Sequence, residues 1–260
     1  MQPEPVIENF DEFKPGDEWR VSREEFIERY FQYEAGQHLT VIGRTGSGKS
    51  VLGFQLTEKV MSPELPAVVL AGKPRDETIG GFQKRNELPI VRAWPPPIVK
   101  SIWQKAANDK PSGWVLWPKH SFDVERDNFN MALQFKRAID DSYRRGNRIL
   151  VADEIAEIQN DLRLKPEVKA VWSRGRSMGT GLWSFTQRPA WIDPLAYNSA
   201  EHLFLAYEPD QSNRKRFGEI GGVDPKLVTE LVMDLDKFEF LYIRRSDPLT
   251  NKPSMCIITG

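Results

Sequence analysis

One run of residues has the types and spacing needed to bind phosphate groups. It reads Gly-Arg-Thr-Gly-Ser-Gly-Lys-Ser from Gly43 to Ser50 and matches the pattern G-x-x-x-x-G-K-[ST]. The glycines let the backbone curl so that successive N–H groups point at phosphate oxygens. A helix beginning near Lys49 would add its partial positive charge. We expect Lys49 to reach the β- and γ-phosphates and the Ser50 hydroxyl to bind a magnesium ion. The predicted nucleotide-binding residues are Gly43, Arg44, Thr45, Gly46, Ser47, Gly48, Lys49, Ser50 and Val51.

A pair of acids follows an apolar run later in the chain. Residues 149–152 read Ile-Leu-Val-Ala and lead directly into Asp153 and Glu154. Parallel strands present their carboxyl ends at one edge of a sheet, where ligands bind. We therefore expect Asp153 to approach the phosphate loop and hold magnesium. Glu154 is then placed to orient and deprotonate an attacking water. The alternative is that both acids only cap the following helix. The phosphate loop upstream favours the catalytic interpretation.

A glutamine and three arginines complete the candidate chemistry. Gln187 follows the predicted strand 181–186, so it belongs to the same sheet edge as the phosphate loop. Its amide can hydrogen-bond both water and a γ-phosphate and so sense the bound nucleotide. Arg174, Arg176 and Arg188 are candidates for stabilising charge on the transferred phosphoryl group, within one chain or across a subunit interface. For each arginine the alternative is an ordinary solvated surface, and the sequence does not choose among them.

The order of these motifs resembles that of a known superfamily. A phosphate loop, an apolar strand ending in Asp-Glu, an Arg-Gly-Arg run and a glycine-led strand ending in Thr-Gln-Arg-Pro are similar to the FtsK/HerA nucleic-acid-pumping ATPases. The resemblance covers about residues 37–189 and is most specific at Gly179–Pro189. It implies a RecA-like (ASCE) P-loop fold, ATP and Mg²⁺ as ligands, and a ring, usually of six subunits. It also implies Glu154 as base, Gln187 as sensor and an arginine finger near Arg174 or Arg176.

Within this superfamily, the sequence most resembles the compact genome-packaging ATPases of viruses and mobile elements. We find no membrane segment, no N-terminal barrel domain and no winged-helix tail in it. The expectation is a motor for double-stranded DNA that works as a hexameric or pentameric ring. A capsid, portal or membrane protein would be its docking partner, in the host cytoplasm or at a virion vertex. One alternative is an ATPase for protein or virion assembly or export that does not respond to DNA. A small-molecule kinase is disfavoured, because no arginine-rich lid follows the loop.

Composition sets bounds on these expectations. The chain has 260 residues, is 40% hydrophobic and has a net charge of -1, which suits one large α/β domain. Any basic surface for DNA must be local. The single cysteine, Cys256, excludes an internal disulfide. The local basic clusters are Lys136-Arg137 with Arg144, Arg145 and Arg148, then Arg214-Lys215-Arg216, then Arg244-Arg245.

Strands that alternate with helices must position these residues. Apolar runs predict strands at 38–42, 67–71, 114–117, 148–152, 181–186, 201–206 and 238–243. Amphipathic or capped segments predict helices at 21–33, 49–61, 127–145, 166–177, 213–219 and 225–233. A strand at 90–93 and a helix at 98–108 are less definite. The alternation predicts an α/β fold with a mostly parallel sheet and helices on both faces. The expected division is an arm and leading helix at 1–36, the ATPase domain at 37–245 and a tail or edge strand at 246–260.

Overall fold

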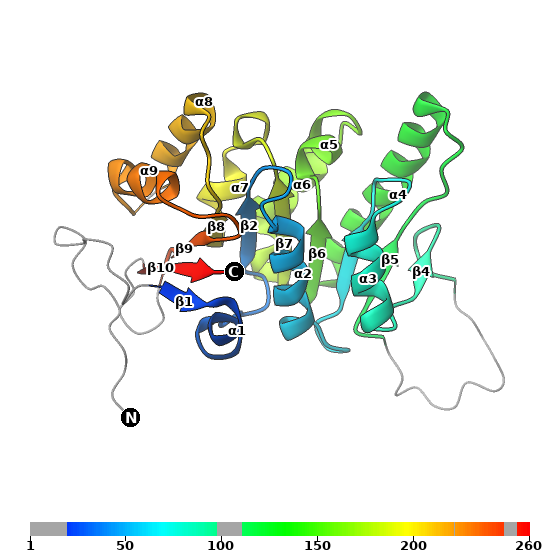
Figure 1. The fold of residues 1–260 in the computed structure, drawn as a ribbon. Coiled ribbons are helices and arrows are strands. Elements are labelled where there is room, and N and C mark those ends of the chain that lie inside the picture. The colour runs from blue at the N-terminus through cyan, green and yellow to red at the C-terminus, as the bar shows by residue number, and fades with distance from the viewer. Residues whose placement is uncertain (1–19, 98–110, 221, 247–253) are drawn as a thin grey trace. The chain divides into compact units, whose positions relative to one another are not determined.

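The computed structural model describes residues 20–97, 111–220, 222–246 and 254–260 (Figure 1). The predicted helix at 98–108 lies outside these residues. The chain forms two compact units. The first contains Met1–Gln32, His38–Lys49 and Phe185–Gly260, and the second contains Tyr33–Gln37 and Ser50–Ser184. The predicted division at residues 36 and 245 stays a prediction.

The second unit is built on parallel strands in the order β7-β6-β3-β5-β4. The residues of β3 and β6 are apolar apart from Arg148, and nearly all are buried, as expected of parallel strands covered on both faces. β7 continues into the first unit through its last two residues. The strands are β3 (Ala67–Leu70), β4 (Ile90–Val91), β5 (Gly113–Leu116), β6 (Arg148–Ala152) and β7 (Thr180–Thr186).

Helices of the second unit cover both faces of these strands. They are α2 (Lys49–Val60), α3 (Glu77–Arg85), α4 (Val124–Arg145), α5 (Ile155–Asn160) and α6 (Lys165–Arg174). The connection from β3 to β4 contains α3, and the connection from β5 to β6 contains α4. These two connections run in opposite directions across the sheet. Right-handed crossovers therefore put α3 and α4 on opposite faces. Phe54 of α2 stacks on Phe82 of α3 with ring centroids 4.7 Å apart, and both helices lie in front of the strands in Figure 1. The prediction of an α/β fold with helices on both faces of a mostly parallel sheet is confirmed.

The first unit has a mixed sheet in the order β1-β10-β9-β8-β2. β2 pairs with β8 in parallel, whereas β9 is antiparallel to both β8 and β10. Phe26, Phe204 and Tyr242 pack together in its core. The strands are β1 (Arg20–Ser22), β2 (His38–Ile42), β8 (Ala200–Leu205), β9 (Phe240–Arg244) and β10 (Ser254–Thr259). The helices are α1 (Arg23–Glu25), which continues as a π-helix at Phe26–Tyr30, α7 (Leu195–Asn198), α8 (Gln211–Lys215) and α9 (Pro225–Met233).

The predicted leading helix at 21–33 is wrong in its extent. The chain first forms β1, which pairs in parallel with β10. Helical structure then begins at Arg23, and the predicted cap is present, because the Glu25 amide donates to Ser22 Oγ at 3.2 Å. A pairing with residues more than two hundred positions away leaves no local pattern, so the sequence favoured one continuous helix.

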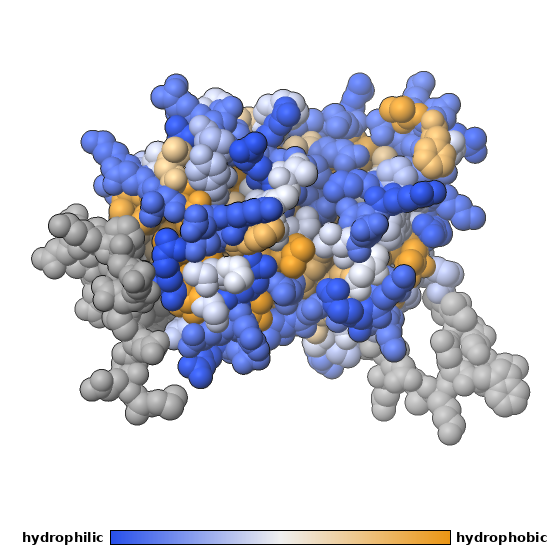
Figure 2. Space-filling model, in the orientation of Figure 1, coloured by the Kyte–Doolittle hydropathy of each residue, from blue (hydrophilic) through white to orange (hydrophobic). Residues whose placement is uncertain are grey.

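The surface in Figure 2 is mainly hydrophilic, with one apolar group over the start of α4. Phe122, Val124 and Phe129 are 80%, 76% and 72% exposed there. Among the helices of the described part of the chain, none has both the length and the hydropathy of a membrane span.

Candidate active site

The phosphate loop of the first unit connects β2 to α2. Gly46 and Gly48 have φ angles of 81° and 87°, in the left-handed region that favours glycine. A side chain at position 43 would collide with the Ser47 side chain, so this position also requires glycine. The Ser47 amide donates to the Arg44 carbonyl at 3.1 Å and closes the turn. The glycines of the motif therefore permit the curled backbone that the sequence predicted.

Several features of this loop fit a triphosphate. Ser47 Oγ is buried and, within the described residues, has no hydrogen-bond partner. A Cβ atom at Gly46 would have nothing within 4 Å, so the backbone there is open to a ligand. Lys49 begins α2 and is 7% exposed. Amides at a helix start together with a lysine provide the charge that a phosphate group needs. Val51, the last predicted contact, is 45% exposed.

Gln187 lies against the phosphate loop. Thr45 Oγ1 donates a hydrogen bond to Gln187 Oε1 at 2.7 Å. The Gly43 amide also donates to the carbonyl of Thr186 at 3.1 Å, so the end of β7 and the start of the loop are joined by backbone. The structure thus brings together the predicted sensor and the predicted cradle. The sensor role itself stays a prediction.

In the second unit, Ser50 and Asp153 form a pair of oxygen donors. Ser50 Oγ donates to Asp153 Oδ1 at 2.5 Å, and Asp153 is 5% exposed at the end of β6. A hydroxyl and a carboxylate are ligands that Mg²⁺ accepts. The ion is usually bound by one or two protein groups, substrate phosphates and water. The described residues contain no group of three His, Cys, Asp or Glu side chains able to hold a metal. The chemistry of the pair fits an ion of this kind, and magnesium binding here stays a prediction.

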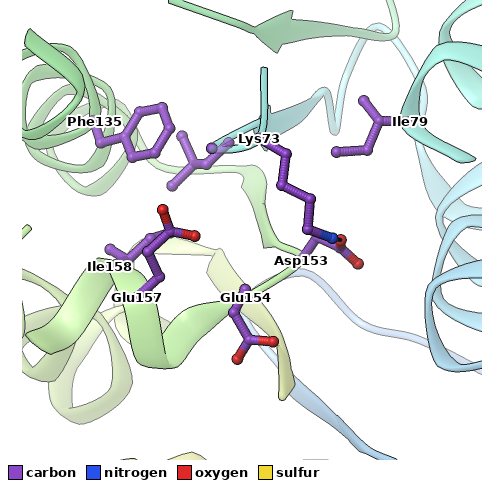
Figure 3. A pocket seen from close by; sticks show the side chains of 9 residues that line it. Lys73, Ile79, Phe135, Asp153, Glu154, Glu157 and Ile158 are labelled. Atoms are coloured by element: carbon purple, nitrogen blue, oxygen red, sulfur yellow. Dashed lines mark hydrogen bonds and ion pairs between the residues drawn. The ribbon is translucent and has the colours of Figure 1, made fainter. Parts of the chain in front are cut away.

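Lys73 binds the other oxygen of Asp153. Its Nζ lies 3.2 Å from Asp153 Oδ2 (Figure 3). The same Nζ lies 3.1 Å from Asp76 Oδ2. Burial lowers the pKa of Lys73, but the two carboxylates outweigh this effect and the pKa is raised. Lys73 follows β3, and Asp153 follows β6, so both lie at the carboxyl edge of these paired parallel strands. The sequence motifs gave no signal for this ion pair.

Glu154 occupies the N-cap position of α5. Its side chain makes no capping hydrogen bond to this helix. The role of Glu154 as the base stays a prediction. Glu157 lies one turn further along α5 and lines the same pocket as Lys73, Asp153 and Glu154. Figure 3 shows the carboxylates of Glu154 and Glu157 pointing in different directions. The pKa of Glu157 is raised. The main cause is burial, followed by the negative charge of Asp161, and the positive charge of Lys73 offsets only part of this effect. The sequence motifs gave no signal for Glu157.

The predicted catalytic arginines are far from Asp153 within their own chain. Arg174 ends α6 and Arg176 follows it, so both precede the start of β7, whereas Asp153 follows the end of β6. These strands are parallel, with Arg148 opposite Thr180. Five residues at ~3.3 Å each separate the two ends by roughly 16 Å, which exceeds the reach of an arginine side chain. A contact with phosphate bound beside Asp153 would have to be made in a neighbouring subunit.

The arginines nevertheless have defined positions. Both Arg174 and Arg176 are exposed, and the Arg174 guanidinium lies 5.7 Å from the centroid of the Tyr143 ring. Arg188 is exposed in the first unit, where its guanidinium lies 4.2 Å from the centroid of the Trp191 ring. Their catalytic roles stay predictions.

Acidic neighbours neutralise much of the first basic cluster. Asp141 binds Arg144 at 2.7 Å and Arg145 at 2.8 Å, and lies 3.7 Å from Arg148. Lys136 pairs with Asp140 and Glu167. In the last cluster, Arg244 is 5% exposed, so its side chain is not available to a phosphate backbone in this structure.

Comparison with known proteins finds similarity at the level of structure. No family model matches the sequence. No curated protein matches it either.

Three solved structures of similar fold come from viral packaging enzymes. The DNA-packaging ATPase B204 from Sulfolobus Turreted Icosahedral Virus has a TM-score of 0.56 at 16% identity, over 88% of this chain and 100% of that one. The genome packaging NTPase B204 from Sulfolobus turreted icosahedral virus 2 with AMPPCP has a TM-score of 0.52 at 16% identity, over 86% of this chain and 98% of that one. Its complex with ATP-gammaS has a TM-score of 0.51 at 16% identity, over 85% of this chain and 96% of that one. The chain therefore has an α/β P-loop ATPase fold like that of these packaging enzymes.

Proposed function

We propose that this protein is a magnesium-dependent ATP hydrolase that translocates double-stranded DNA, as a genome-packaging or DNA-transfer motor working in a ring. The observation that carries the proposal is the 2.5 Å hydrogen bond between Ser50 and Asp153. It joins the last residue of the phosphate-loop motif to the acid that ends β6. This pairing of a loop hydroxyl with an acid from a second strand is what a nucleotide-bound magnesium requires.

Each of the site residues has a separate role in hydrolysis. Backbone N–H groups of residues 43–48 and the Lys49 ammonium bind the phosphates of ATP. Ser50 and Asp153 would hold a magnesium ion, which would supply compensating positive charge during hydrolysis. Glu154 accepts a proton from a water, whose oxygen bonds to the γ-phosphorus as the bond to the bridging oxygen of ADP breaks. Gln187 orients the water and contacts the γ-phosphate.

The fold and the exposed arginines support the translocase part of the proposal. The similar structures are described as DNA- or genome-packaging enzymes. The exposed position of Arg174 and Arg176 suits charge stabilisation in trans, with each nucleotide contacted by two chains. The working location would be the host cytoplasm or a virion vertex, with a capsid, portal or membrane protein as docking partner.

Steady-state ATP hydrolysis with and without double-stranded DNA tests the proposal. The assay uses low and moderate salt, and a Glu154→Gln chain as the blank. We expect DNA to stimulate hydrolysis and the stimulation to fade as salt rises, because phosphate contacts by Lys and Arg release counterions. Hydrolysis that is indifferent to DNA would overturn the translocase part and favour an assembly or export ATPase. Absence of Mg²⁺-dependent hydrolysis in the wild type would contradict the proposal as a whole.

A further inference from the structure

A cavity of about 370 Å³ lies beside the phosphate loop in the first unit. Arg44, Thr45, Gly46 and Ser47 form one wall. The opposite wall comes from the segment after β8 and from the turn between α9 and β9. This wall consists of Ala206, Tyr207, Leu235, Asp236, Lys237, Phe238 and Glu239. The volume lies in the range of small-molecule sites. No residue of this second wall belongs to the motifs that predicted ATP hydrolysis.

Phe238 has an unusual conformation for an aromatic residue in this wall. Its φ angle is 72°, in the left-handed region that bulky side chains rarely adopt, and its side chain is 43% exposed. Such strain persists only where the surrounding structure fixes it, and it clusters at ligand sites. Here Arg23 Nη2 donates to the Phe238 carbonyl at 2.8 Å. Gly260 lies against the Phe238 Cβ, so close that a Cβ at Gly260 would be 2.9 Å away.

The ring of Phe238 is directed at the phosphate loop. A Cβ atom at Gly48 would lie 3.2 Å from Phe238 Cδ1, so the ring edge covers this glycine. The Lys237 ammonium lies 4.8 Å from the ring centroid. The next residue, Glu239, is 7% exposed and forms an ion pair with Arg20, which anchors the turn to β1. A half-exposed aromatic ring thus lies between the loop and the cavity.

We propose that this cavity binds the nucleobase and ribose of the nucleotide, with Phe238 as the aromatic surface on which the base stacks. The inference rests on the proposed function, because the loop must first hold the phosphates. The remainder of the nucleotide then extends from the loop into the adjoining cavity. Stacking responds to the area of a base rather than to its edges, so purine nucleotides bind better than pyrimidine nucleotides and ATP and GTP bind similarly.

Binding of ATP and of inorganic tripolyphosphate to Phe238→Ala separates this role from that of the loop. Titration calorimetry with Mg²⁺ gives both affinities. We expect Phe238→Ala to weaken ATP binding about tenfold and to leave tripolyphosphate binding unchanged, because only ATP has a base to stack. Phe238→Trp, which keeps an aromatic surface, should retain wild-type affinity for ATP. Phe122→Ala is the matched control, because Phe122 is also exposed and has a φ angle of 65°.

Two outcomes would overturn the inference. One is unchanged ATP affinity in Phe238→Ala. The other is an equal loss of ATP and tripolyphosphate affinity, which would show that Phe238 only supports the loop through Gly48. Failure of the proposed function looks different, because the wild-type chain would then bind neither ligand.

Discussion

At the scale of single residues, Asp153 has a separate partner for each carboxylate oxygen. Ser50 donates to Oδ1, and Lys73 pairs with Oδ2. Two fixed partners define the orientation of a carboxylate before any ligand arrives, which is the preorganisation that a metal site requires. Lys73 has Asp76 as a second partner, so its charge stays compensated when Asp153 engages a metal.

Glu154→Gln tests the base at this site. The amide keeps the size and polarity of the side chain but cannot accept a proton, so we expect normal ATP binding and hydrolysis slowed by about 10²–10⁴. Binding is measured by titration calorimetry and hydrolysis by phosphate release. Glu125→Gln, an exposed acid in the first turn of α4, is the control. Turnover near the wild-type rate in Glu154→Gln would remove Glu154 from the base role.

His202 predicts how stability depends on pH. Burial, with the positive charge of Arg244, lowers the pKa of this histidine to about 3 from its usual 6.5. The native state therefore binds fewer protons than the unfolded state. The contribution of neutral His202 to the free energy of unfolding is complete above pH 6.5 and is lost as the pH falls towards 3. Between neutral pH and about pH 5 the loss is about 2 kcal/mol.

Urea unfolding of wild type and His202→Gln at several pH values checks this effect. Glutamine can still hydrogen-bond the Tyr242 hydroxyl, which lies 2.9 Å from His202 Nδ1. We expect the variant to lose less free energy of unfolding than the wild type over the same pH interval. Equal pH dependence in the two chains would show that His202 does not carry it.

At the scale of elements, the segment 33–37 crosses close over β7. A Cβ atom at Gly181 would collide with the Tyr33 hydroxyl and the Gln37 carbonyl. The Tyr33 ring also packs against Trp183 at a centroid distance of 5.1 Å. β7 therefore needs a residue without a side chain where this segment passes.

Gly181→Ala should destabilise the protein by about 1–3 kcal/mol, because β7 and the crossing segment would have to separate. The free energy of unfolding in urea measures the effect. Gly80→Ala in α3 is the matched control, since a Cβ there would meet nothing within 4 Å. The control should raise stability by about 0.5–1 kcal/mol through the better helix propensity of alanine. A neutral Gly181→Ala would contradict the close crossing.

The sequence predicted the strands next to the motifs well. β2 and β6 have their predicted bounds, and β3 and β7 differ by one residue, because each is almost wholly buried and built around apolar residues. The Lys73–Asp153 pair was not predictable. It depends on the register of β3 against β6, which sets Leu70 opposite Ala152. Because of this register, the loop that carries Lys73 and the loop that carries Asp153 begin side by side. The same limit applies to the strand β10, whose pairing joins distant parts of the chain.

At the scale of the whole molecule, a catalytic role for Arg174 or Arg176 would require a second chain. Arg174 and Arg176 are exposed at the end of α6, beyond reach of phosphate bound beside Asp153 of their own chain. Assembly into a ring would set these side chains of one subunit against the nucleotide of the next.

Mixing of inactive chains tests this arrangement. We expect an Arg174→Ala/Arg176→Ala chain and a Lys49→Ala chain to be inactive alone. Mixing them should restore hydrolysis. The double arginine variant supplies an intact nucleotide site, and the Lys49→Ala chain supplies the arginines. A mixture of Lys49→Ala with Glu154→Gln, which both lack a working site, is the control and should stay inactive. Full activity of the double arginine variant alone, or a mixture without hydrolysis, would contradict action in trans.

The pairing of β1 with β10 has a consequence for synthesis on the ribosome. Arg20 pairs with Ile257 and Ser22 with Thr259, so the first described strand has no partner until nearly the whole chain has emerged. The second unit takes its residues from 33–37 and 50–184, and all of them are translated before the segment Phe185–Gly260 of the first unit. The second unit can therefore fold early, while the nascent phosphate loop waits for β8 and for the turn that carries Phe238. The nucleotide binding proposed for the phosphate loop and Phe238 would then be a late event in the biogenesis of the chain, because the turn that carries Phe238 is translated after the whole of the second unit.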